Sequence, residues 1–154
     1  MIDAIDVDHE ILNEAFIQHH ASNISYQYAD FLEADLPEAS YDLIVSIASL
    51  HHMDLEVALN KMKFLLRPSG KLLILGLYQE TTIVDYLYSA ISIPLNLIYL
   101  IWHCELTTIP RKVAPTHPAQ LSLKQIKTVM NDVIPGFYLK RHLFWRYSVI
   151  WQKC

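Results

Sequence analysis

A carboxylate and a pair of histidines stand at the ends of segments that predict β-strands. Asp6 closes the segment that begins at Ile2, and His51-His52 follow the apolar run at 43–45. A carboxylate at a strand end can accept hydrogen bonds from both hydroxyls of a ribose. A histidine titrates near neutrality and can take a proton from a reacting hydroxyl. These residues therefore predict nucleoside binding and proton transfer.

Each of these side chains also has a purely structural interpretation. Asp6 can be a solvated acid near a strand end, and one histidine can pack in its loop and cap the backbone. Metal binding is the weaker option, because adjacent side chains are expected to diverge. Neither His19-His20 nor His51-His52 has the i, i+4 spacing of a helical metal pair. No metal site is predicted.

The segment from Tyr41 to Tyr78 predicts the unit that positions the histidines. Unbroken apolar runs at 43–45 and 72–75 are typical of parallel strands that are buried on both faces. Between them, apolar residues at helical spacing follow Asp54, a predicted N-cap. These residues are Leu55, Ala58, Leu59, Met62, Leu65 and Leu66. We expect a tight turn at 68–70, and a βαβ unit whose ligand lies near 46–52 and 76–79.

The flanking segments predict further strands and helices. Before this unit we expect a strand over 2–7, a helix capped by Asp8, and a strand over 24–29. After it we expect a helix over 121–133, capped by Ser122 and stopped at Pro135-Gly136. Two final strands, over 137–143 and 145–151, predict an antiparallel hairpin.

The order of these pieces resembles the class I S-adenosylmethionine-dependent methyltransferases. The residues that carry the resemblance are AIDVDHEIL around Asp6, Tyr41-Asp42-Leu43, Leu50-His51-His52, and the helix ending Leu66-Arg67-Pro68-x-Gly70. The resemblance implies an α/β, Rossmann-like three-layer sandwich with a mostly parallel sheet and a C-terminal antiparallel hairpin. It also implies a single domain over 1–154 that transfers a methyl group from S-adenosylmethionine to an unidentified small-molecule acceptor, leaving S-adenosylhomocysteine.

The resemblance also implies a cofactor site. Asp6 would bind the ribose, and Val7 would pack on the adenine. Asp30 would accept a hydrogen bond from the adenine amino group, beside Phe31; a turn residue that caps local backbone stays open for Asp30. The loop after the next strand would add Ser46, Ile47 and Leu50 to the cofactor site. His51 and His52 would face the methyl donor and acceptor as catalytic candidates.

One part of the family pattern is missing. In the family, the first strand ends in a glycine-rich loop that approaches the methionine carboxylate. The three glycines of this chain, Gly70, Gly76 and Gly136, all follow Asp6. We therefore expect an N-terminally truncated domain that lacks the first strand. It would be a fragment, a relative that no longer binds cofactor, or a chain whose partner strand comes from another molecule. The alternative function is a catalytically silent interaction module that forms a homodimer through exposed sheet edges.

Composition limits the classes of partner and the cellular compartment that the chain fits. A net charge of -4 without a basic run gives no electrostatic case for a nucleic-acid partner. The acids of the first ten residues do not fit a signal peptide. Cys104 and Cys154 fit neither a disulfide framework nor a metal site, so a reducing cytoplasm is the simplest compartment.

The segment from Tyr86 to Cys104 carries no Asp, Glu, Lys or Arg. Its length approaches that of a membrane span, but Pro94 and Asn96 interrupt it. We expect a pair of apolar helices broken before Pro94, within a lid insertion at about 81–120 over the acceptor site. Such a lid would favour a small or lipophilic acceptor. Peripheral contact with lipid and a transmembrane span are the alternatives.

Overall fold

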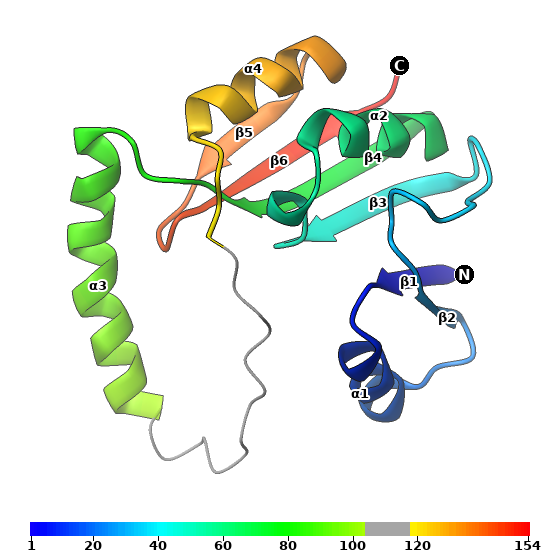
Figure 1. Ribbon diagram of the computed structural model, residues 1–154, viewed down its shortest axis with the longest axis horizontal. Coiled ribbons are helices and arrows are strands. Elements are labelled where there is room, and N and C mark those ends of the chain that lie inside the picture. Colours follow the sequence, from blue (N-terminus) through cyan, green and yellow to red (C-terminus); the bar gives the residue numbers. More distant parts are fainter. Residues whose placement is uncertain (104–117) are drawn as a thin grey trace. The chain divides into compact units, whose positions relative to one another are not determined.

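The strands of the protein belong to two separate sheets in the computed structural model, which describes residues 1–103 and 118–154 (Figure 1). The chain divides into two compact units, Met1–Glu38 (unit 1) and Ala39–Cys154 (unit 2). We describe each by itself. Residues 104–117, which include Cys104 and part of the predicted lid, lie outside the described residues.

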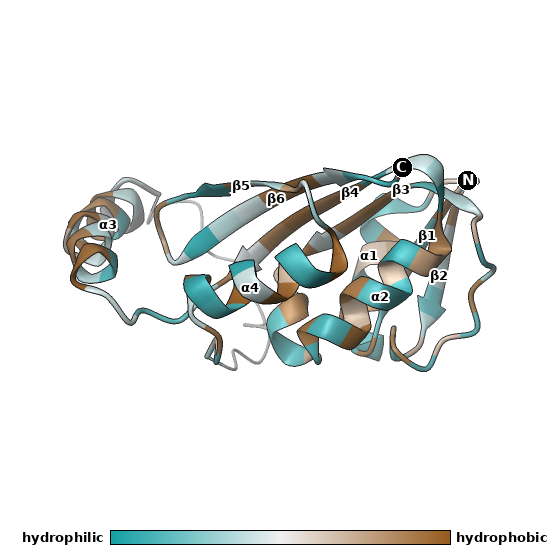
Figure 2. Ribbon diagram, turned by 90° about the horizontal axis from the view of Figure 1, so that it is seen from above, coloured by the Kyte–Doolittle hydropathy of each residue, from teal (hydrophilic) through white to brown (hydrophobic). Residues whose placement is uncertain are grey.

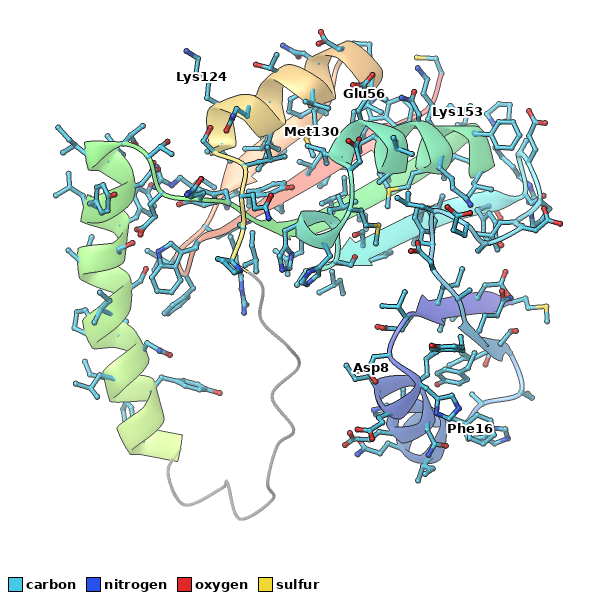
Figure 3. All side chains as sticks on the ribbon, viewed as in Figure 1. Asp8, Phe16, Glu56, Lys124, Met130 and Lys153 are labelled. Atoms are coloured by element: carbon cyan, nitrogen blue, oxygen red, sulfur yellow. The ribbon has the colours of Figure 1, made fainter. Side chains whose placement is uncertain are left out.

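Unit 1 is a βαβ unit. Strands β1 (Ile2–Asp6) and β2 (Ile24–Tyr28) pair in parallel, and helix α1 (His9–His19) connects them. Asp8 stands at the start of α1 (Figure 3). Its carboxylate accepts hydrogen bonds from the backbone N–H groups of the second and third helical residues, which confirms the predicted N-cap. Within this helix, only Leu12 is buried.

Unit 2 is built on a four-stranded sheet in the order β3-β4-β6-β5. Its strands are β3 (Tyr41–Ile47), β4 (Leu66–Leu77), β5 (Tyr138–Arg141) and β6 (Arg146–Gln152). β3 and β4 are parallel and are joined through helix α2 (Leu55–Leu65), whereas β6 is antiparallel to both β4 and β5. The predicted βαβ unit and the closing hairpin are therefore both confirmed.

The core of unit 2 lies between the sheet and two helices. α2 and α4 (Leu123–Val133) cover the same face of the sheet (Figure 2). Along β4, buried Leu72 and Ile74 alternate with half-buried residues, as the period of a strand requires. The helices contribute Leu55, Ala58, Leu59, Met62, Leu65, Ile126, Met130 and Val133 to this core. The apolar positions predicted for α2 are thus confirmed.

The opposite face of the sheet carries apolar side chains that are exposed. Strand β3 contributes Leu43, Val45 and Ile47, and β6 contributes Ile150; each is at least half exposed. β3 is also an edge strand of its sheet. Within the described residues of unit 2, helices α2 and α4 therefore cover one face of the sheet and leave an apolar face open.

The tight turn predicted at 68–70 is wrong. β4 begins directly after α2 and runs through these residues, with a shift in its register to β3 and a positive φ of 64° at Ser69. The reason lies at the other end of the chain. The backbone of Lys153 pairs with Ser69 and Gly70, and its ammonium donates to the carbonyls of Lys63 and Leu66 at the end of α2 (Figure 3). These contacts satisfy the backbone without a turn.

The predicted helix break before Pro94 is also wrong. Helix α3 (Ile83–His103) runs continuously through this proline. Proline removes one backbone N–H, which leaves the carbonyl of Ala90 without its helical partner. Ala90 and Pro94 are both exposed, so solvent can satisfy that carbonyl and no break is required. In the two ranges that the structure describes, no helix is both long and apolar enough to cross a membrane.

Candidate functional site

The carboxyl ends of β1 and β2 bring four predicted cofactor residues together in unit 1. The two strands are parallel neighbours, and Asp6 at the end of β1 lies opposite Tyr28 at the end of β2. Val7 follows β1 and is exposed, whereas Asp30 and half-buried Phe31 follow β2 closely. The fold of unit 1 therefore places these four residues at or just after the carboxyl ends of its two strands.

The carboxylates of Asp6 and Asp30 are each oriented by a hydrogen bond from a backbone N–H group two residues later. Asp6 Oδ1 accepts a hydrogen bond from the Asp8 N–H at 2.9 Å, and Asp30 Oδ1 accepts one from the Leu32 N–H at 2.8 Å. Asp30 thus caps its turn, which is the structural interpretation of this residue. An ionised carboxylate has two oxygens and can accept further hydrogen bonds. Capping and ligand binding are therefore compatible at both positions.

The carboxyl end of β3 positions the predicted residues of unit 2. Ser46 and Leu50 are buried there, whereas Ile47 points outward and is exposed. The loop is held against β4, because the Ala48 N–H donates to the Leu75 carbonyl at 2.7 Å. The Ser46 and Ser49 hydroxyls form a hydrogen bond with 2.8 Å between their oxygens. Ser49 was not predicted from the sequence, although its i+3 spacing from Ser46 is visible there.

Ala48 carries backbone strain at this strand end. Its φ is 52°, in the left-handed region where a side chain costs about 1 kcal/mol. The bend directs the chain into the short helical turn η1 (Leu50–His52), which contains the two histidines. Nothing in the sequence marks an alanine for this conformation.

His51 and His52 lie against each other. Their ring centroids are 3.8 Å apart and the ring planes are inclined by 41°. The expectation that these adjacent side chains diverge is therefore wrong. His51 is half-buried and His52 is exposed, so His52 is the more accessible of the two to a ligand. Among the described residues, no three His, Cys, Asp or Glu side chains are grouped so that they could hold a metal ion.

A buried ionic cluster lies beyond the carboxyl end of β4. Arg141 Nη2 is 2.6 Å from Asp85 Oδ1, and Arg141 Nε donates to the Tyr78 hydroxyl at 2.8 Å. The guanidinium also stacks over the ring of Tyr88, 4.0 Å from its centroid. The cluster joins the start of α3 to β5.

Asp85 also caps the start of α3. Its Oδ2 accepts hydrogen bonds from the backbone of Thr81 and Thr82, and its own N–H donates to the Thr82 hydroxyl. Burial alone would raise the pKa of Asp85, but these hydrogen bonds and the charge of Arg141 outweigh it and lower the pKa. This role of Asp85 was not predicted from the sequence, although Thr82-x-x-Asp85 matches a capping box.

Known proteins resemble this chain in sequence. A family model described as a methyltransferase domain matches residues 2–74. An uncharacterised methyltransferase of Mycobacterium bovis is 27% identical over 161 residues, which span 98% of this chain and 75% of the relative. A relative from Mycobacterium tuberculosis matches to the same extent.

Solved structures agree in fold. An S-adenosylmethionine-dependent methyltransferase from Aquifex aeolicus superposes with a TM-score of 0.60 at 17% identity, over 99% of this chain and 68% of that one. The N-methyltransferase NodS from Bradyrhizobium japonicum, solved with S-adenosylhomocysteine, gives a TM-score of 0.59 at 15% identity, over 98% and 65%. The family match and the named relatives support a class I S-adenosylmethionine-dependent methyltransferase. The fold is the predicted Rossmann-like α/β fold.

The matched range contains the nine residues that were named from the sequence as candidates for the cofactor and catalytic site. Asp6, Val7, Asp30, Phe31, Ser46, Ile47, Leu50, His51 and His52 all lie within 2–74. The buried cluster of Asp85, Tyr78 and Arg141 lies outside it. The family match therefore covers the predicted cofactor residues, whereas the cluster is a feature of the segments that follow.

Proposed function

We propose that this chain is a methyltransferase that binds the adenosine part of S-adenosylmethionine through Asp6 and Asp30 and methylates a small-molecule acceptor. The observation that carries the proposal is the pair of carboxylates at the neighbouring ends of β1 and β2. Each is oriented by a backbone N–H, and a fixed carboxylate loses less entropy when it binds a ligand. Both lie in the range that matches the methyltransferase domain.

The residues of unit 1 suit the adenosine end of the cofactor. Asp6 would accept hydrogen bonds from the ribose hydroxyls, and Asp30 would accept one from the adenine amino group. Val7 and Phe31 would pack against the base, and both have exposed apolar surface for that contact. No glycine precedes Asp6, so we assign no residue of this chain to the methionine carboxylate.

The loop after β3 is the proposed contribution of unit 2. Ser46, Ile47 and Leu50 would line the cofactor site, as in the family pattern. When bound, the cofactor supplies an electrophilic methyl group on a sulfonium. Positioning alone can supply much of the acceleration of such a transfer. His51 or His52 would take a proton only if the acceptor is a hydroxyl or a similar group.

The acceptor is proposed to be small or lipophilic. The segment at about 81–120 would form a lid over it, and α3 supplies the described part of that segment. The segment is rich in apolar residues, which suit contact with a lipophilic acceptor. The location that we propose is the cytoplasm, where the exposed thiol of Cys154 would stay reduced.

Substitution at Asp6 tests the assignment of the cofactor residues. Asp6→Asn should weaken S-adenosylhomocysteine binding by about tenfold or more, because a hydrogen bond to a charged group contributes about 1.5–3 kcal/mol. Asp35→Asn is the matched control, since Asp35 is an exposed acid of the same unit. Equal affinities of the two variants, measured by calorimetry, would remove Asp6 from the site.

We also propose that two copies of this chain pair through β3. The edge position of this strand and the exposed side chains of Leu43 and Val45 favour such pairing. Sedimentation velocity should then show a dimer that Val45→Lys converts to a monomer. A monomer at every concentration would contradict the pairing. A catalytically silent module is the weaker alternative, because the relatives are methyltransferases.

A further inference from the structure

Helix α3 buries polar side chains and exposes apolar ones, which is the opposite of a helix that packs on a protein core in water. Its buried side chains are polar: Asp85, Ser89 and Ser92, which the helical period places on one face. The opposite face carries large apolar side chains, each more than half exposed. This outer stripe consists of Ile83, Val84, Leu87, Ile91, Ile98 and Trp102. A surface helix normally buries its apolar face and exposes its polar one.

The orientation of α3 is fixed by polar contacts along its inner face. Asp85 pairs with Arg141, and the Ser89 hydroxyl donates to Glu80. The Ser92 hydroxyl accepts a hydrogen bond from the Phe144 N–H at 3.1 Å. Rotation of the helix to bury the outer stripe would break all of these contacts and leave polar groups unsatisfied. The stripe therefore faces away from the rest of unit 2, and α3 stands beside the sheet (Figure 1).

We propose that the outer stripe of α3 docks on the surface of a lipid bilayer with zwitterionic head groups. The charge of the helix matches such a surface. Asp85 is the one formally charged residue between Ile83 and His103, and Arg141 neutralises it on the inner face. The net charge of -4 gives the chain no attraction to anionic lipids. Trp102 is 82% exposed, and tryptophan favours the boundary between water and lipid.

A bilayer suits the stripe better than a second protein does. Protein interfaces combine apolar anchors in pockets with a polar rim that fixes the partner. The stripe is the convex side of a single helix, about 30 Å long at 1.5 Å per residue. Fluid lipid can adapt to a convex apolar surface, and an interfacial helix buries one face in the head-group region. The proposal does not depend on the cofactor site.

Vesicle flotation of the whole 154-residue chain tests the proposal. The probe is a phosphatidylcholine vesicle, and the test variant is Leu87→Gln/Ile91→Gln/Ile98→Gln. The matched control is Val57→Gln/Phe64→Gln, because these two residues of α2 are also apolar and about half exposed. Circular dichroism checks that all three chains keep their helix content. Tryptophan emission with Trp102→Phe as reference reports whether Trp102 enters the lipid.

The unsubstituted chain and the control should float. The triple variant should lose at least about tenfold in partitioning, because three apolar side chains no longer enter the lipid. The emission of Trp102 should shift to shorter wavelength, and phosphatidylglycerol should not strengthen binding. Failure of the unsubstituted chain to float overturns the proposal, as does equal flotation of both variants. A dimer in vesicle-free buffer that the triple variant dissociates, without flotation, would make a second copy the occupant instead.

Discussion

Arg141 and Asp85 form an ion pair inside unit 2, with 2.6 Å between the guanidinium and the carboxylate. Their side chains are only 16% and 6% exposed. Arg141 ends β5, whereas Asp85 lies in the first turn of α3, so the pair joins segments that are far apart in the sequence. Two charges that leave water together are tolerated because each neutralises the other. The position of α3 therefore depends on both side chains.

Removal of one partner should destabilise the protein far more than loss of a surface pair. Arg141→Met leaves the carboxylate of Asp85 buried without its counter-charge, which should cost about 3–5 kcal/mol of the free energy of unfolding. Arg67→Met is the control, because the Arg67–Asp42 pair is 51% and 82% exposed and should contribute less than about 1 kcal/mol. Urea unfolding measures both. Similar small losses would show that the buried pair does not hold the fold.

The contribution of the Asp85 carboxylate to the free energy of unfolding should vanish in acid. The folded-state pKa of Asp85 is below its ordinary value of 3.8, because hydrogen bonds and Arg141 outweigh the effect of burial. A lowered pKa stabilises the folded protein above the unfolded value, and this stability is lost as the pH falls through the folded value. The unsubstituted chain should therefore lose its advantage over Asp85→Asn below about pH 4. A constant difference down to pH 2 would contradict the lowered pKa.

Tyr147 should resist ionisation in alkali. Burial of its ring raises the pKa of Tyr147 to about 12. A side chain at Gly76 would overlap this ring, which shows how closely it is packed. A raised pKa stabilises the folded protein below the unfolded value of about 10, and this stability is lost as the pH rises through the folded value. Absorbance titration should show a late phase near pH 12 that Tyr147→Phe removes. A late phase that persists in this variant would assign it to another tyrosine.

Local sequence signals were enough to predict most elements of the fold. The buried residues of α2 recur at helical spacing, and Asp54 accepts the Val57 N–H as its cap. Ser122 and Gln125 form the capping box at the start of α4. Apolar runs marked β3 and β4. Each of these signals acts between residues that are near in the sequence, so no knowledge of the fold was needed.

The contacts that the sequence did not reveal connect distant residues. Lys153 draws Ser69 and Gly70 into β4, and Arg141 holds Asp85, so neither contact leaves a local pattern. The candidate site likewise has features that local sequence predicts and features that it does not. Asp6 and Asp30 could be predicted as candidates from the sequence because both follow strands. It gave no sign of the bend at Ala48, where the fold of the loop overrides the preference of alanine.

Binding of S-adenosylhomocysteine to the chain, measured by calorimetry, tests the central claim most directly. If Asp6 and Asp30 hold the adenosine end, the ligand should bind one site with a dissociation constant in about the micromolar to low millimolar range, as for weakly held ligands. Adenosine should compete, because the contacts proposed for Asp6 and Asp30 lie at that end of the molecule. Absence of binding to the folded chain at about millimolar ligand would contradict the proposed cofactor site and leave the interaction module as the better account.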